Sequence, residues 1–142
     1  MPEHALVQLG QKAVLIRDDR CLILEGSNGE DQWDLPGGRL HEGEKSMDAF
    51  RRELEEELGL TDFSFIATVD YDLWARGAGK PTICLVANLI TSDQQDIEIS
   101  FEHKGFRWVE RSELSKYTFY SPAMPRMIEK GFDHLELLKN AK

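Results

Sequence analysis

One internal segment, residues 37–60, carries its own helix start and stop signals and thereby limits the folds open to this chain. Ser46 has the residue type of an N-cap, and Gly59 suits the position just after a helix, so a helix of about three turns is predicted from Ser46 to Leu58. Its apolar residues recur at spacings of three and four: Met47, Phe50, Leu54 and Leu58. Such a stripe must be buried against another element, and the rest of the chain offers strands.

Short β-rich runs occur before this helix. Residues 12–17 and 21–24 are separated by Asp18 and Asp19, which predicts two strands joined by a tight turn. After the helix, every odd position from 63 to 73 is apolar or aromatic, and this period of two predicts a half-buried strand or a pair of strands.

Two further segments complete the strand predictions. Residues 82–90 are almost all apolar, as expected of a central strand covered on both faces, and residues 105–109 give one more short strand. Near the end of the chain, Ser121 and Pro122 resemble an N-cap and a first helical residue, which predicts a second helix. The expected fold class is therefore mixed α/β, organised as one domain over residues 1–142.

Charge and cysteine content exclude several functional classes. The 142 residues contain 17 Lys and Arg against 26 Asp and Glu, a net charge of −9, without a basic run. Long nucleic acids and anionic membranes are therefore not expected partners. The N-terminus lacks a signal-peptide pattern, and the longest apolar run is too short to span a bilayer. Cys21 and Cys84 both lie in apolar segments, which predicts reduced core cysteines and a cytoplasmic location.

The predicted helix places three carboxylates, Glu53, Glu56 and Glu57, on one face. Like charges at these spacings cost roughly 0.2–0.5 kcal/mol per pair, and anions in a last helical turn cost roughly 0.3–1 kcal/mol each. A solvated acidic face is the simplest interpretation, but Arg52 is the only nearby cation on the helix that could offset it. A hard divalent cation, Mg²⁺ or Mn²⁺, would remove the conflict and would also attract an anionic substrate.

The segment resembles the Nudix box, whose pattern is G, five residues, E, seven residues, then R-E-apolar-x-E-E-x-G-apolar. Every fixed position is matched at the required spacing: Gly38, Glu44, Arg52, Glu53, Leu54, Glu56, Glu57, Gly59 and Leu60. Residues 33–37 are similar to the strand and turn that lead into the box. The resemblance implies an α/β/α sandwich with a mixed central sheet.

The resemblance also implies roles for individual residues. Glu53, Glu56 and Glu57 would bind the divalent ions, together with the backbone carbonyl of Gly37. Glu53 and Glu57 would be catalytic, with Glu53 the general base in some members, and which carboxylate acts as base stays open. Arg52 would orient Glu53, while Gly38 and Glu44 would support the loop around the site.

Residues outside the helix add weaker candidates. A fourth metal-binding carboxylate is expected from Glu102, with Glu98 as the alternative. Arg39 is a candidate for contacting a substrate phosphate and Trp33 for contacting the substrate. Other aromatic and histidine residues have packing or loop positions as their simpler interpretation: Trp74, Tyr117, Phe119, Tyr120, His41 and His103.

The resemblance implies Mg²⁺- or Mn²⁺-dependent hydrolysis of a phosphoanhydride bond in a small nucleotide-like molecule. The short chain leaves little room for an additional N-terminal domain, which favours a nucleoside triphosphate. ADP-ribose or a dinucleotide is the alternative substrate. A sensor that binds a pyrophosphate ligand without turnover is a third hypothesis, disfavoured because every carboxylate of the box is present.

Overall fold

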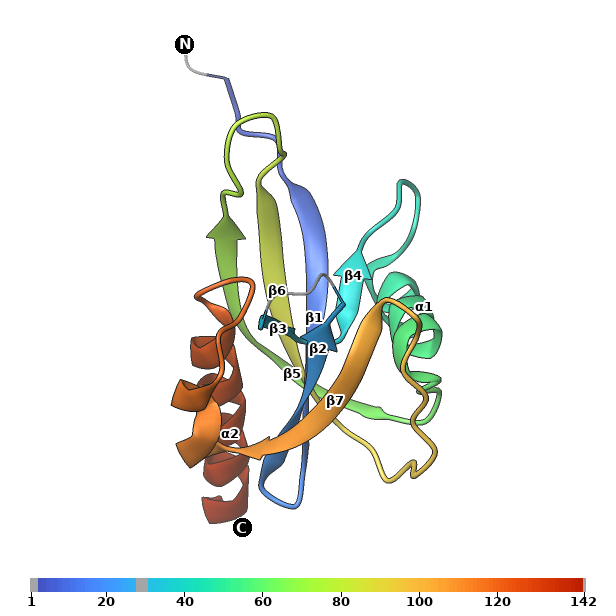
Figure 1. Ribbon diagram of the computed structural model, residues 1–142, viewed down its shortest axis with the longest axis vertical. Helices are drawn as coiled ribbons and strands as arrows, with labels where there is room; N and C mark the ends of the chain where they lie inside the picture. The colour runs from blue at the N-terminus through green and yellow to red at the C-terminus, as the bar shows by residue number, and fades with distance from the viewer. Residues whose placement is uncertain (1–2, 28–30, 142) are drawn as a thin grey trace.

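The computed structural model describes residues 3–27 and 31–141. Their helices and strands follow in chain order (Figure 1): β1 (Gln8–Arg17), β2 (Arg20–Gly26), β3 (Trp33–Asp34), β4 (Gly37–Arg39), α1 (Ser46–Leu58), β5 (Ser64–Trp74), β6 (Ile83–Thr91), β7 (His103–Glu110), the 3₁₀ helix η1 (Arg111–Lys116) and α2 (Met124–Asn140).

Strand β1 organises the sheet. It pairs in parallel with β6 and antiparallel with β2 and β4, while β5 adds antiparallel to the far side of β6. Strands β3 and β7 both pair antiparallel with β2. The described strands therefore form a mixed sheet in which β1 is the junction.

Helices α1 and α2 lie on opposite sides of this sheet, as Figure 1 shows. Alternate residues of β1 point into two apolar clusters: Val14 and Ile16 pack with α2, whereas Ala13 and Leu15 pack with α1. The α/β/α sandwich with a mixed central sheet, expected from the sequence, is confirmed.

The predicted turns and helix end are present at the expected residues. Asp18 and Asp19 both adopt positive φ, at 52° and 61°, as a two-residue type I′ hairpin turn requires. Gly59 ends α1 in the left-handed region, with φ 63°. The helix covers Ser46–Leu58 as predicted, but its N-cap is Lys45 rather than Ser46, which is already helical.

Strand β5 differs from the predicted burial. Register shifts between Phe65 and Ala67 and again before Asp70 interrupt the simple alternation. The odd-numbered Tyr71 and Leu73 consequently face outward, 67% and 59% exposed. Trp74 instead packs against the α2 side of the sheet.

Two other sequence predictions need correction. Helix α2 begins at Met124, so Pro125 rather than Pro122 lies in its first turn. Cys21 is buried as predicted, but Cys84 is only partly buried. No helix among residues 3–27 and 31–141 has both the length and the apolar content needed to cross a membrane.

Candidate active site

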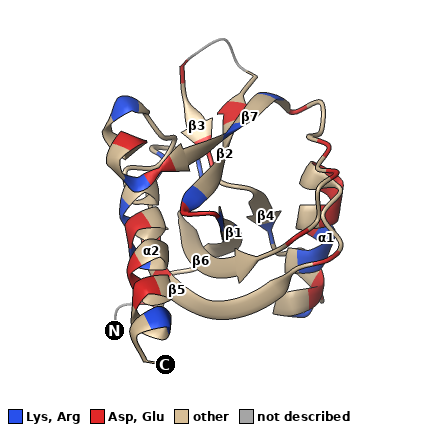
Figure 2. Ribbon diagram, turned by 90° about the horizontal axis from the view of Figure 1, so that it is seen from below, with Lys and Arg blue, Asp and Glu red and all other residues tan. Residues whose placement is uncertain are grey.

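The three carboxylates of α1 lie in three different environments. Glu57 is buried, Glu53 is mostly covered, and Glu56 has 60% of its side chain exposed. Glu57 shares the buried face of the helix with Leu54 and Leu58. Figure 2 shows Asp and Glu gathered on α1, so this end of the molecule carries a strong negative charge.

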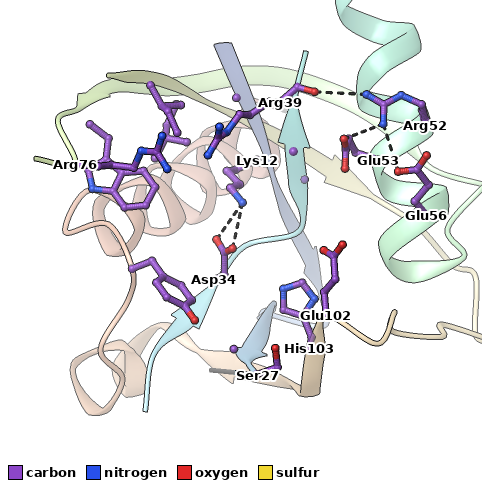
Figure 3. A pocket seen from close by; sticks show the side chains of 18 of the residues that line it. Lys12, Ser27, Asp34, Arg39, Arg52, Glu53, Glu56, Arg76, Glu102 and His103 are labelled. Atoms are coloured by element: carbon purple, nitrogen blue, oxygen red, sulfur yellow. Dashed lines mark hydrogen bonds and ion pairs between the residues drawn. The ribbon is translucent and has the colours of Figure 1, made fainter. Parts of the chain in front are cut away.

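Arg52 binds several of these acids at once. Its guanidinium donates two hydrogen bonds to Glu44, at 2.8 and 2.9 Å, and one to Glu53 at 2.8 Å. A weaker contact of 3.3 Å reaches Glu56 (Figure 3). Hydrogen bonding to Arg52 lowers the pKa of Glu44 to about 2. Arg52 therefore offsets more of the acidic repulsion than the sequence predicted, by linking the loop before α1 to the helix.

Glu57 has a separate partner. Its Oε1 accepts a 2.6 Å hydrogen bond from the backbone N–H of Gly37, and its Oε2 lies 3.9 Å from Nε2 of His103. Burial raises the pKa of Glu57 to about 7, although Lys12 and the Gly37 N–H act in the opposite direction. The carboxyl group is thus poised to change protonation near neutral pH.

The glycine pair lets β4 approach its neighbours closely. Gly37 has φ of 140°, and a Cβ there would lie 1.9 Å from the carbonyl oxygen of Gln11. A Cβ on Gly38 would lie 2.3 Å from the carboxylate carbon of Glu53. Bare backbone is therefore required at Gly37, whereas at Gly38 the Glu53 carboxylate occupies the space that a side chain would take.

These residues fit a hard divalent cation in chemistry. Glu53, Glu56 and Glu57 supply carboxylate oxygens, and the glycine pair brings bare backbone against Glu53. In residues 3–27 and 31–141, however, no three acidic, histidine or cysteine side chains are grouped around one point. Arg52 and the Gly37 N–H engage the carboxylates instead.

A cleft of about 610 Å³ runs from this acidic region along the sheet. Glu53, Glu56 and Arg52 line one end, and the glycine pair lines the adjoining wall. The volume lies within the range of about 300–1,000 Å³ that is typical of small-molecule sites. The cleft can therefore hold a ligand that reaches the carboxylates.

A partly buried ion pair lies in the middle of the cleft. Nζ of Lys12 lies 3.1 Å from Oδ1 of Asp34 and also donates to the carbonyl oxygen of Leu35 at 3.2 Å (Figure 3). Burial acts to lower the pKa of Lys12, but Asp34, Glu57 and Glu53 outweigh it and the net pKa is raised. Lys12 therefore stays charged beside the acidic end.

The two candidate loop carboxylates occupy different places. Glu102 lines the cleft next to His103, at the start of β7, as Figure 3 shows. Glu98 does not line the cleft; its backbone N–H donates to the carbonyl of Leu58 at the end of α1. Nδ1 of His103 is buried and has no hydrogen-bond partner among the described residues.

The two predicted substrate contacts also differ. Arg39 lines the cleft, and its guanidinium donates to the Gln8 side chain at 2.9 Å. Trp33 is only 4% exposed and does not line the cleft. Its ring packs edge-on against Tyr117, with Arg107 over it. The structure therefore places Trp33 in the core rather than at a ligand.

The remaining candidates divide between the cleft and the core. Trp74, Tyr120 and His41 line the cleft. Phe119 is buried, and Tyr117 packs against the same apolar cluster.

Sequence reasoning missed Lys12, Asp34 and Arg76, which also line the cleft. The available signal was Lys12 itself, a charged residue within an apolar strand. Its partner Asp34 lies 22 residues away and is brought near only by the fold.

Comparison with known proteins identifies the family. The sequence model described as "NUDIX domain" matches residues 8–130. The chain is 31% identical over 117 residues to the nucleoside triphosphatase NudI of Salmonella paratyphi B, covering 72% of this chain and 82% of that protein. It is 33% identical over 95 residues to the protein of the same name from Escherichia fergusonii, covering 61% of this chain and 67% of that protein.

Solved structures agree on the fold. A C. elegans Ap4A hydrolase in a binary complex superposes with a TM-score of 0.79 at 22% identity, covering 92% of this chain and 98% of that one. The E. coli ORF135 protein superposes with a TM-score of 0.72 at 23% identity, covering 97% of this chain and 96% of that one. With Gly38, Arg52, Glu53 and Glu56 of the box lining one cleft and the domain match spanning most of the sequence, the chain belongs to the Nudix family of pyrophosphohydrolases.

Proposed function

We propose that this protein hydrolyses a phosphoanhydride bond of a nucleoside triphosphate, using Mg²⁺ or Mn²⁺. The observation that carries the proposal is the shared cleft, which brings Glu102, just before β7, to the same cavity as Glu53 and Glu56 of α1. The similarity to proteins named nucleoside triphosphatase supports the choice of substrate. A small nucleotide, rather than a nucleic acid polymer or a membrane, is the proposed partner.

The residues that would hold the cation are Glu53, Glu56, Glu57, Glu102 and the carbonyl oxygen of Gly37. When bound, a divalent cation polarises water and neutralises charge on the phosphate oxygens. Lys12 on β1 and Arg39 on β4 both line the cleft and add positive charge along it.

Glu53 is our choice of general base. It lines the cleft, whereas Glu57 does not, and a base must reach the attacking water. Arg52 donates a 2.8 Å hydrogen bond to Oε1 of Glu53 and so holds the carboxylate in one orientation. Glu57 is engaged by Gly37 and would instead fix the glycine turn against the helix.

The chemical step then follows from these positions. The oxygen of water forms a bond to phosphorus as the bond from phosphorus to the bridging oxygen breaks. The leaving phosphate keeps the electron pair of that bond, and the proton of the attacking water passes to the Glu53 carboxylate. The products are two phosphate-bearing molecules, one of which retains the nucleoside.

A product-release assay tests this proposal. Purified protein with Mg²⁺ or Mn²⁺ is supplied with the ribo- and deoxynucleoside triphosphates, ADP-ribose, diadenosine tetraphosphate and nucleotide sugars. We expect turnover of one or more triphosphates, and we expect Glu53→Gln to reduce kcat by about 10²–10⁴ with a smaller effect on ligand affinity.

Other results would redirect the assignment. Turnover confined to ADP-ribose or diadenosine tetraphosphate would support the dinucleotide alternative. Measurable binding of triphosphates without turnover of any substrate would support the sensor hypothesis and overturn the proposed activity.

A further inference from the structure

His103, the first residue of β7, is a buried histidine with an unpartnered ring nitrogen. Its side chain is only 8% exposed. It lines the cleft beside Glu102, and Figure 3 shows these two side chains next to each other. Nδ1 is buried and makes no hydrogen bond to any of the residues that the structure describes. A buried nitrogen without a partner costs stability, so the orientation of this ring calls for another explanation.

The other ring nitrogen faces a carboxylate of α1. Nε2 lies 3.9 Å from Oε2 of Glu57, while Oε1 of the same carboxyl group accepts the 2.6 Å bond from Gly37. Glu57 therefore has β4 on one side and β7 on the other. A shift of about 1 Å would bring Nε2 of His103 within hydrogen-bond distance. Because each carboxylate oxygen has more than one acceptor site, Glu57 could still reach a cation.

The backbone also holds His103 near the end of α1. The N–H of Ser100 donates to the carbonyl oxygen of Glu57 at 2.9 Å, and the N–H of His103 donates to the carbonyl oxygen of Ser100 at 3.2 Å. The N–H of Glu98 donates to the carbonyl oxygen of Leu58 at 2.9 Å. The last carbonyl groups of a helix lack partners within the helix, and this segment supplies them. The chain before β7 is thus fixed against the helical turn that carries Glu57.

We propose that His103 is a positioning residue for the reaction. Its Nε2–H donates to Oε2 of Glu57 and, with the Gly37 N–H on the other oxygen, fixes the orientation of this carboxylate. The inference rests on the proposed function, which assigns Glu57 to the cation. Because Glu102 precedes His103 in the chain, the same contact links the loop carboxylate to the helix carboxylate. Replacing a group that orients a metal ligand typically costs about 10–100-fold in metal affinity or activity.

His103→Phe tests this role, because phenylalanine keeps an aromatic ring and removes both nitrogens. Calorimetry with Mn²⁺ alone should show a Kd about 10–100-fold higher than in the wild type. At saturating Mn²⁺, kcat should fall by a similar factor while KM for the nucleoside triphosphate stays within about twofold. The Tm in EDTA should not fall, because the variant removes the unpartnered nitrogen. A merely structural role would instead lower this Tm.

Two conservative variants separate the ring nitrogens. Glutamine at position 103 places an amide nitrogen near the position of Nε2, whereas asparagine places one near Nδ1. His103→Gln should therefore recover most of the Mn²⁺ affinity, and His103→Asn should not. This comparison also decides the matter if His103→Phe folds poorly. Equal Mn²⁺ affinity in the glutamine and asparagine variants would overturn the proposal.

A double-mutant cycle asks whether His103 acts through Glu57. In a Glu57→Gln background, His103→Phe should change the Mn²⁺ Kd by no more than about twofold, since the carboxylate that it positions is already gone. Independent, additive effects would contradict the proposed contact. His134→Phe is the control, because His134 lies on α2 outside the cleft and should keep wild-type Mn²⁺ binding.

The outcomes distinguish this inference from the proposed function. Wild-type turnover of a triphosphate, together with unchanged Mn²⁺ affinity in His103→Phe, would overturn the role of His103 and leave the hydrolysis intact. Weaker Mn²⁺ binding in His103→Phe that the glutamine variant restores, without turnover of any triphosphate by the wild type, would support the role of His103 and refute the proposed function.

Discussion

The backbone N–H of Gly37 donates a 2.6 Å hydrogen bond to the buried carboxyl group of Glu57, which lies 20 residues later in the chain. This bond joins the last turn of α1 to the glycine turn that begins β4. Because Gly37 itself packs against the backbone of Gln11 on β1, the same contact fixes the helix relative to the sheet. Glu57 therefore has a structural role in addition to its proposed role at the metal.

The raised pKa of Glu57 predicts how the metal-free protein responds to pH. The pKa is about 7 in the folded state against 4.5 for the free group, so folding favours the protonated form. The resulting stabilisation is fully present below pH 4.5 and is lost as pH rises through 7. In EDTA, we expect the wild type to lose roughly 2–4 kcal/mol relative to Glu57→Gln between pH 4.5 and 8.

Urea unfolding at several pH values measures this difference. Glutamine keeps an acceptor for the Gly37 N–H but cannot ionise, so the variant isolates the titration. Parallel stability curves for the two proteins across this range would show that Glu57 titrates near its ordinary pKa.

Arg52 gives a second prediction, because it binds three carboxylates. Arg52→Ala should lower kcat by about 10–100-fold, less than Glu53→Gln, since it removes an orienting group and leaves the base itself. Arg52→Lys should restore little of the activity, because lysine lacks the planar fork that meets Glu44 through two bonds. Steady-state kinetics on Arg52→Ala, Arg52→Lys and Glu53→Gln measures the relative size of these losses in kcat.

The same substitution should also change acid unfolding. Arg52 holds the pKa of Glu44 near 2, so this ion pair stabilises the fold above pH 4.5 and its contribution is lost as pH falls toward 2. Arg52→Ala should therefore begin to unfold at a higher pH than wild type, as measured by circular dichroism. Coincident acid transitions would contradict a structural role for the pair.

The parts of the fold that local chemistry determines were predictable. The turn at Asp18 and Asp19 and the end of α1 at Gly59 depend on residues that favour positive φ, and the sequence displays them. The box spacing likewise identified Glu53 and Arg52, which are neighbours on one helix.

Features that depend on distant segments were not predictable from spacing. The shifts in β5 arise from its pairing with β6, and they turn Tyr71 and Leu73 outward although their alternation with polar residues is regular. The Lys12–Asp34 pair joins residues on different strands. Trp33 has an aromatic side chain of the kind that stacks on ligands, but it is buried and packs against Tyr117. Tertiary contacts, absent from any local pattern, determine each of these outcomes.

Divalent metal should stabilise the native protein. If the α1 carboxylates bind it, millimolar Mg²⁺ or Mn²⁺ should raise Tm, because a ligand that binds only the folded state stabilises that state. Glu56→Gln should reduce this rise while changing metal-free stability by no more than about 0.5 kcal/mol, as for other exposed positions. Glu55→Gln, one residue away, exposed and outside the cleft, is the matched control and should keep the full rise. A constant Tm throughout the wild-type titration would argue against the site.

The final prediction concerns the loop carboxylate. Glu102 lines the cleft from the start of β7, whereas Glu98 is held beside the end of α1. Glu102→Gln should therefore reduce kcat by about 10–100-fold, less than Glu53→Gln does, and leave the metal-free Tm nearly unchanged because its side chain is exposed. Glu98→Gln serves as the control and should retain wild-type kinetics. Loss of activity in the Glu98 variant alone would transfer the role to that residue, and full activity in both would mean that the helix carboxylates and water complete the site.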